Sequence, residues 1–377
     1  MNIPKLRFKD NNGNDYPQWE KKKLGDIVQF LDNKRKPLEQ SERIHGKYPY
    51  YGASGIIDYI NNYIFDEELV LLSEDGANII DRNYPICYIA TGKYWVNNHA
   101  HVLKTKSQYL NKFLCEALER LNYNKYNTGT AQPKLNQDIC KNILLNIPIL
   151  HEQEKIANFF STIDKKIKNL ANTITSLENQ KKGLLQQIFS QKLRFKDKNG
   201  NNYPNWKKKK LGDLFTIKAG GDINKENFSE QYSIEFKYPV YANALTNNGL
   251  YGYSNIYKID KPSITVTGRG INVGFALSRE PFYYPIVRLL VLIPNININF
   301  TFFTESINFI HIFNESTGVP QLTAPQLSKV NVYVPNIEEQ NKIGNLFDKL
   351  NEKIDNKKAQ LEHWKQIKKG LLQQMFV

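Results

Sequence analysis

Two stretches of the chain place apolar side chains alternately three and four positions apart, which is typical of a helix that packs along one apolar seam. They extend from about residue 152 to 190 and from about 339 to 376, and neither contains a proline. We predict two long helices of equal length that pack on each other as a coiled coil. The seam positions are Ile156, Phe160, Ile163, Ile167, Leu170, Ile174, Leu177, Leu184 and Ile188 in the first helix, and Ile343, Phe347, Leu350, Ile354, Leu361, Trp364, Leu371 and Met375 in the second.

Three lysines interrupt the seams: Lys181 in the first stretch, and Lys357 and Lys368 in the second. A polar residue at a seam position costs stability but can fix the register of a helix pair. The alternative arrangement is that each helix packs only on a globular domain of its own. Because the two seams match in length and pattern, the paired arrangement is favoured.

The segments outside these helices follow a different pattern. Residues from about 20 to 147 and from about 207 to 334 are rich in Tyr, Phe, Ile, Asn and Gly, with short apolar runs between turn residues. Such runs predict short strands, and the clearest lie at 69–72, 86–90, 263–267 and 287–293. Helices are expected at 108–121 and 302–313. The predicted fold class is therefore α+β, with two domains that are rich in short strands.

The chain is an internal duplication. Residues 5–26 return as residues 192–213 with four of 22 positions changed, and the helix end GLLQQIF returns as GLLQQMF. The two interiors resemble each other only loosely in sequence. This contrast suggests that the repeated segments share a task and that the interiors do not. If the chain were closed, its end would lead back to residue 5, so we predict a circular, pseudo-twofold arrangement. The predicted segments are a first domain at 1–150, a first spacer helix at 151–191, a second domain at 192–336 and a second spacer helix at 337–377.

The composition of the chain indicates its kind of partner and its environment. The formal net charge of +14 favours an acidic partner, which could be DNA, ribosomal RNA or a membrane surface. No run of about 18 apolar residues and no secretory leader is found, so a soluble, cytoplasmic protein is expected. The three cysteines, Cys87, Cys115 and Cys140, lack metal-like spacing and are expected to be reduced and buried.

No arrangement of residues predicts catalysis or a cofactor site in this chain. Gly268, Gly270 and Gly274 lack the Lys-Ser/Thr of a phosphate loop and have the wrong spacing for a dinucleotide fingerprint. His99 and His101 could share one face of a strand, but no acid or cysteine lies at zinc-like spacing, so no metal is expected. Polar contact with DNA or solvent is the preferred interpretation of these histidines.

Both interiors carry basic, amide and small residues that suit the reading of a nucleic acid. Arginine can contact guanine O6 and N7, Asn or Gln can contact adenine, and lysine mostly contacts phosphate. Further basic positions in the second interior include Arg288. The residues predicted to contact DNA are Lys34, Arg35, Lys36, Arg43, Lys47, Ser54, Asn97, Asn98, His99, His101, Thr130, Gln132 and Lys134 in the first interior, and Lys218, Asn243, Asn247, Thr267, Arg269, Arg279, Thr317 and Gln321 in the second.

Taken together, the motifs resemble the specificity subunits of type I restriction-modification systems over nearly the whole chain. They comprise the repeated Lys-Leu-Gly-Asp, Tyr-Pro-x-Tyr and Gly-Leu-Leu-Gln-Gln motifs, Glu-Asp-Gly76, Asn97-Asn-His99, Gly-Arg-Gly270, and Pro148, Glu152 and Gln153 with their counterparts Pro335, Glu339 and Gln340. The resemblance implies two target-recognition domains, each of which reads one half of a split DNA sequence, separated by an antiparallel pair of long coiled-coil helices. It implies two methyltransferase subunits that methylate adenine with S-adenosylmethionine, and two nuclease-translocase subunits that use ATP and Mg. The chain itself would hold no cofactor.

The sequence leaves two alternatives of other classes open. One is a self-sufficient DNA nuclease or methyltransferase whose catalytic residues are not recognisable. The other is a coiled-coil scaffold that associates with nucleic acid without sequence preference. Two divergent α+β domains argue against a scaffold, since a scaffold does not need two different heads.

Overall fold

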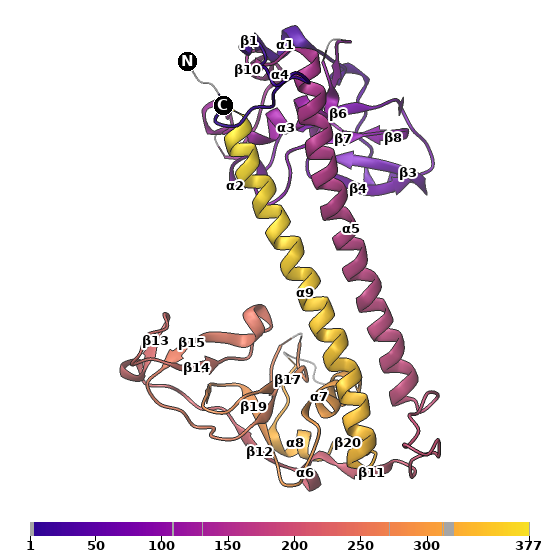
Figure 1. Ribbon diagram of the computed structural model, residues 1–377, viewed down its shortest axis with the longest axis vertical. Coiled ribbons are helices and arrows are strands. Elements are labelled where there is room, and N and C mark those ends of the chain that lie inside the picture. Colours follow the sequence, from indigo (N-terminus) through magenta and orange to yellow (C-terminus); the bar gives the residue numbers. More distant parts are fainter. Residues whose placement is uncertain are drawn as a thin grey trace. The chain divides into compact units, whose positions relative to one another are not determined.

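The computed structural model describes residues 4–107, 109–129, 131–270, 272–310, 312 and 320–376. The chain forms two compact units. Unit 1 comprises residues 1–171 and 359–377, and unit 2 comprises residues 172–358. Each unit contains one interior and parts of both long helices (Figure 1).

Unit 1 contains two four-stranded sheets. The first has the antiparallel order β2 (Val28–Phe30), β9 (Ala100–Thr105), β6 (Leu69–Ser73), β7 (Cys87–Ala90). The second has the order β4 (Gly55–Ile60), β3 (His45–Gly52), β8 (Lys93–Val96), β5 (Phe65–Asp66), with β3 and β8 parallel. The helices of this interior are α1 (Leu24–Ile27), α2 (Asn78–Asp81), α3 (Asn111–Arg120) and α4 (Gln137–Lys141), with 3-10 turns η1 (Asp32–Lys34), η2 (Gln40–Glu42) and η3 (Asn124–Tyr126).

Unit 2 repeats this plan. Its first sheet has the antiparallel order β12 (Phe215–Ala219), β19 (Leu289–Pro294), β16 (Ser263–Thr267), β17 (Ala276–Arg279). Its second sheet has the order β13 (Phe228–Ser229), β15 (Leu250–Ser254), β14 (Tyr238–Tyr241), β18 (Tyr284–Pro285), with β14 and β18 parallel. The helices are α6 (Leu211–Leu214), α7 (Phe300–Ile310) and α8 (Ala324–Ser328), with 3-10 turns η4 (Lys225–Asn227) and η5 (Thr246–Gly249).

The central strand β6 accounts for one of the short apolar runs of the first interior. All five of its residues are buried, because both faces of the strand are covered. Val70 and Leu72 join a core with Phe113 of α3, whereas Leu69 and Leu71 join a core with the second sheet. The central strand of unit 2, β16, is likewise buried along its whole length. The predicted α+β fold class and the predicted helices near 108–121 and 302–313 are confirmed by these elements.

Each interior is closed by a two-stranded sheet at its boundaries. β1 (Glu20–Lys23) pairs with β10 (Leu144–Ile147), and the first rung joins Glu20 to Ile147. In unit 2, β11 (Lys207–Lys210) pairs with β20 (Asn331–Val334), and the first rung joins Lys207 to Val334. The chain therefore enters and leaves each interior at one place.

The two predicted long helices are confirmed as α5 (Leu150–Phe189) and α9 (Ile337–Met375). Within each unit the helices run antiparallel: Asp164 pairs with Lys368 in unit 1, and Glu178 pairs with Lys358 in unit 2. Every predicted seam residue is buried or half-buried. Among the residues that the structure describes, no helix combines the length and the apolar character needed to span a membrane.

Two of the three lysines that interrupt the seams, Lys181 and Lys368, contact the interior helices. Lys368 of α9 lies 2.9 Å from Glu116 of α3 and 2.7 Å from Asp164, and Lys112 joins the same cluster. Lys181, the counterpart of Lys368, lies 2.6 Å from Glu305 of α7. Both glutamates are buried, so each pair fixes one register between a long helix and an interior.

The repeated edge motifs hold each long helix to its domain. Gln153 donates to the Pro148 carbonyl and accepts from the Leu110 amide. Gln340 makes the matching bonds to Pro335 and Asn299. The repeated Pro-x-x-x-Glu-Gln pattern is therefore explained by hydrogen bonds inside the protein.

The repeated helix ends also have matching environments. Phe376 packs against Trp19, Phe113 and Phe160 in unit 1. Phe189 packs against Trp206, Phe302 and Phe347 in unit 2. Leu6 donates its amide to the Gln374 carbonyl just as Leu193 donates to Gln187, both at 3.0 Å. The end of α9 thus meets residue 6 as the end of α5 meets residue 193.

The three cysteines are free and buried, as predicted.

Candidate nucleic-acid interface

Three of the segments predicted to contact DNA in the first interior meet at the end of β6. Glu74 donates its amide to the His99 carbonyl at 2.9 Å, and Gly76 donates to the Pro133 carbonyl at 3.0 Å. Leu135 donates to Glu74 at 2.7 Å, and Asp75 pairs with Lys134 as an isolated bridge. Ser73 in turn donates its hydroxyl to the Ala53 carbonyl. Loops that are far apart in the sequence therefore form one edge of the domain.

Unit 2 has the same backbone arrangement at the end of β16. Gly268 donates to the Arg288 carbonyl at 3.1 Å, Gly270 donates to Pro320 at 2.9 Å, and Leu322 donates to Gly268 at 2.8 Å. Arg269 forms the isolated bridge with Gln321. These bonds establish a residue correspondence: Asp75 with Arg269, His99 with Arg288, and Lys134 with Gln321. We call these two places the reading edges of unit 1 and unit 2.

Both glycines of Gly-Arg-Gly270 are favoured by the local backbone of unit 2. A Cβ on Gly268 would lie 2.4 Å from the Arg288 carbonyl oxygen, and Gly270 has a φ of +90°. Gly76 occupies the matching position with a φ of +106°. Both conformations favour glycine, so the motif has a reason inside the fold as well as any role toward DNA.

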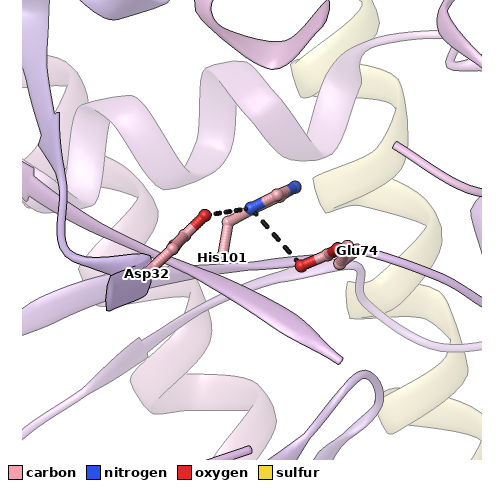
Figure 2. Close-up of side chains that lie close together, drawn as sticks. All are labelled: Asp32, Glu74 and His101. Atoms are coloured by element: carbon pink, nitrogen blue, oxygen red, sulfur yellow. Dashed lines mark hydrogen bonds and ion pairs between the residues drawn. The ribbon is translucent and has the colours of Figure 1, made fainter. Parts of the chain in front are cut away.

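Near the reading edge of unit 1, charged side chains form a network. Figure 2 shows three of its members, Asp32, Glu74 and His101. The His101 Nδ1 lies 2.6 Å from Asp32 and 3.7 Å from Glu74. Arg35 lies 2.5 Å from Glu74 and 3.6 Å from Asp32. Oxygen and nitrogen atoms of Asp32, Glu74 and His101 lie within 4.8 Å of one another, which is close enough for a metal site.

The hydrogen bonds of His101 argue against metal binding at this cluster. Its Nε2 lies 2.7 Å from the Leu135 carbonyl, which can only accept, so Nε2 carries a proton. Its Nδ1 faces the Asp32 carboxylate, so this nitrogen donates as well and neither has a lone pair for a metal. The Arg35 guanidinium already supplies the cation between the two acids. The cluster is therefore best described as a charge network within the domain.

The charge network depends on protonated His101. Burial is the largest single influence and lowers the pKa of His101, but the hydrogen bonds and electrostatic interactions with Asp32 and Cys140 together raise it more, and the resulting pKa is about 10. A folded-state pKa above the unfolded value near 6.5 favours the folded state at low pH. This stabilisation is complete below about pH 6.5 and is lost as the pH rises through about 10.

We expect the stability of unit 1 to depend on pH through this histidine. The difference in unfolding free energy between the native chain and a His101→Gln variant should be largest below pH 6.5 and should shrink between pH 7 and 10. Urea unfolding of both proteins across this range measures the difference, and subtraction removes the other titrating groups that the two proteins share. A difference that stays constant over the range would contradict the assignment.

The structure places the predicted DNA contacts in different environments. Arg35, Arg43 and Asn243 are half-buried, and Thr130 and Thr317 lie outside the described residues. The reading edges hold Asn98, His99, Gln132 and Lys134 in unit 1, and Asn243, Arg269 and Gln321 in unit 2. The exposed residues are Lys34, Lys36, Lys47, Ser54, Asn98, His99, Gln132, Lys134, Lys218, Asn247, Arg269 and Gln321.

Four predicted contacts are corrected, because their side chains are buried: Asn97, His101, Thr267 and Arg279. Asn97 accepts from the His99 amide, and Thr267 donates to the Asn272 carbonyl. Arg279 donates to Thr265 and to the Asn248 carbonyl. We assign these side chains to the hydrogen-bond network of the protein rather than to the DNA surface.

Two residues of the reading edges were not predicted. Asp75 binds the His99 Nδ1 at 2.8 Å, and Asn272 lines a hollow beside Arg269. Alignment of Ser73-Glu-Asp-Gly76 with Thr267-Gly-Arg-Gly270 would have identified Asp75 as the counterpart of Arg269. The weak similarity of the interiors hides this relation in the sequence.

Comparison with known proteins matches both halves of the chain. The model of the type I restriction modification DNA specificity domain matches residues 16–179 and 203–365. A Mycoplasma pneumoniae protein, provisionally named a type I specificity subunit, is 27% identical over 334 residues, which cover 87% of this chain and 88% of that protein. The MjaVIII specificity subunit of a type I restriction enzyme from Methanocaldococcus jannaschii is 23% identical over 411 residues, with 97% and 94% covered.

The fold has a match among solved structures. The crystal structure of a type I restriction-modification S subunit from M. genitalium has a TM-score of 0.71 to this chain at 19% identity and covers 99% of both chains. At this identity the likeness concerns the fold. The same architecture of two similar units and two long helices is thus found in a solved structure.

Proposed function

Because the chain belongs to the type I restriction modification DNA specificity family, we propose that it reads a bipartite, asymmetric DNA sequence and directs partner subunits to it. Each interior would read one half of the target through its reading edge. The length of α5 and α9 would set the spacer between the half-sites. The family membership supports DNA recognition in general, and the details of the target are the proposal.

One observation carries the asymmetry of the target. The reading edges share the same backbone hydrogen bonds but present different side chains: Asp75, His99 and Lys134 in unit 1, and Arg269, Arg288 and Gln321 in unit 2. Base edges in the major groove differ in their donors and acceptors. Two edges with different donors and acceptors would therefore prefer different sequences.

Catalysis would come from partners. We propose that two methyltransferase subunits supply S-adenosylmethionine-dependent methylation of adenine, and that two nuclease-translocase subunits supply ATP- and Mg-dependent restriction. The chain itself would bind DNA and hold no cofactor. Its exposed cations, among them Lys34, Lys47 and Lys218, would contribute phosphate contacts that weaken as salt is added.

We expect the purified chain to bind DNA in an electrophoretic or fluorescence assay and to neither cut nor methylate it. Addition of the methyltransferase subunits of the same restriction-modification system should produce adenine methylation at one split sequence, which single-molecule sequencing detects. Methyl transfer by the chain alone, after removal of contaminating subunits, would instead identify a self-sufficient methyltransferase. Methylation at many unrelated sequences would point to a scaffold without sequence preference.

A further inference from the structure

The reading edges carry side chains of opposite charge on the same backbone. Asp75 follows β6 in unit 1, and Arg269 occupies the matching position after β16 in unit 2. The neighbouring strand contributes His99 in unit 1 and Arg288 in unit 2. The duplication has therefore placed an acid beside an imidazole at one edge, and two guanidinium groups at the other.

The two arginines flank a hollow in the surface of unit 2. Its volume is about 520 Å³, and its walls include Asn243, Arg269, Gly270, Asn272 and Arg288. No carboxylate is found among the described residues that line it. The hollow therefore offers hydrogen-bond donors and positive charge without a competing acid.

Arg269 and Arg288 are available to a ligand. Both are exposed, and within the described part of the chain neither guanidinium has a hydrogen-bond or ion-pair partner. The contrast with Arg35 and Arg279 is clear, because those arginines are engaged by Glu74 and by Thr265, respectively. Two arginines without a hydrogen-bond or ion-pair partner among the described residues therefore line the same hollow.

The loop that carries Arg269 is held in place by Asn243. The Asn243 side-chain oxygen accepts from the Gly268 amide at 2.6 Å and from the Arg269 amide at 3.1 Å, and its side-chain nitrogen donates to the Arg269 carbonyl at 2.8 Å. These bonds fix the backbone at both sides of the Arg269 Cα. Asn243 is thus a positioning residue, and Arg269 projects from a loop that loses little freedom on binding.

We propose that the hollow between Arg269 and Arg288 is the base-reading site of unit 2 and that it takes the acceptor edge of a guanine. Guanine presents two acceptors, O6 and N7, in the major groove, and a guanidinium can donate to both. At the matching place in unit 1 the Asp75 carboxylate would repel such acceptors, so a guanine is not expected at the equivalent position of the other half-site. The inference rests on the proposed function.

The test uses the full chain assembled with its methyltransferase partners, and reads the methylated sequence of Arg269→Gln, Arg288→Gln and the double variant. We expect one guanine of one half-site to become degenerate, with a loss of preference of roughly five- to 150-fold. The other half-site and the spacer should not change. Lys329→Gln, which removes an exposed cation that does not line the hollow, is the matched control and should leave the sequence as it is.

Binding to DNA with a modified base distinguishes a contact to the guanine from a contact to phosphate. Replacement of that guanine by 7-deazaguanine removes N7 and should weaken binding of the native complex but not of the double variant. Inosine keeps O6 and N7 and should be bound like guanine. Equal weakening on every sequence, with a shallower salt dependence, would assign the arginines to phosphate and overturn the inference.

Two further outcomes would test the guanine site and the proposed function separately. An unchanged methylated sequence in the double variant, with native thermal unfolding, overturns the guanine site while the proposed function stands. A native complex that methylates no defined sequence overturns the proposed function, and the guanine site with it.

Discussion

Exchange of residues 20–147 for the interior of another member of the family is expected to replace one half of the recognised DNA sequence and to leave the other half and the spacer intact. The junctions lie on one rung of a two-stranded sheet, since Glu20 pairs with Ile147. A foreign interior that ends in the same rung can therefore be joined without displacing the helices. Sequencing of methylated adenines in cells that carry the chimera and its partners measures the result.

The donor interior must also fit the helices that it packs on. Glu116 of α3 pairs with Lys368 of α9, and the Leu110 amide is capped by Gln153. A second chimera that keeps residues 109–120 of this chain is therefore the matched control. If the donor lacks an acid at the Glu116 position, this control should fold and methylate better than the simple exchange.

The reciprocal exchange of residues 207–334 should change the opposite half-site. Its junctions also share a rung, between Lys207 and Val334. If either exchange altered both halves of the sequence, the two interiors would not be independent readers. Each exchange is expected to replace the recognised half-site completely, and this is the largest functional effect expected for this chain.

The elements were predictable where sequence carries a local signal. The heptad seams identified α5 and α9 because a buried stripe repeats every three or four residues in a helix. The runs at 69–72 and 263–267 identified β6 and β16, whose residues are all buried and mostly apolar or β-branched. The boundaries at 20, 147, 207 and 334 followed from the contrast between repeated edges and divergent interiors.

The site was less predictable because its residues are joined only by the fold. The sequence allowed His99 and His101 to share one face of a strand, but β9 begins at Ala100, and His101 is buried against Asp32, 69 positions away. The partners of the seam lysines Lys181 and Lys368 were equally hard to predict. Their interruption was visible in the sequence, but their partners Glu116 and Glu305 were not, since these acids stand on helices more than a hundred residues away.

The repeated edges have a different explanation. Arg7 and Trp19 reach Glu152 from 145 and 133 positions away, and Arg194 and Trp206 reach Glu339 across the same separations. Near-identity of residues 5–26 and 192–213 is therefore accounted for by packing on the helix starts. The sequence showed that these segments share a task, and the structure identifies the task as holding each helix to its domain.

Replacement of Glu152 by alanine is expected to have the largest effect on stability. Glu152 is fully buried and accepts two bonds from Arg7, at 2.6 and 3.0 Å, and one from Trp19 at 3.0 Å. Its removal leaves a partly buried guanidinium without its carboxylate, which typically costs about 3–5 kcal/mol. For a unit of this size the melting temperature should fall by roughly 6–20 °C.

The effect should be confined to unit 1. Hydrogen exchange followed by mass spectrometry reads the two units separately, so Glu152→Ala should increase exchange in residues 4–171 with little change in unit 2. Glu339→Ala should produce the opposite pattern, because Glu339 is held by Arg194 and Trp206 in unit 2. Glu154→Ala is the matched control, since Glu154 is exposed and its carboxylate pairs with His151 at 3.3 Å, on the same helix. Equal destabilisation by Glu152→Ala and Glu154→Ala would show that the buried contacts with Arg7 and Trp19 do not hold the helix to its domain.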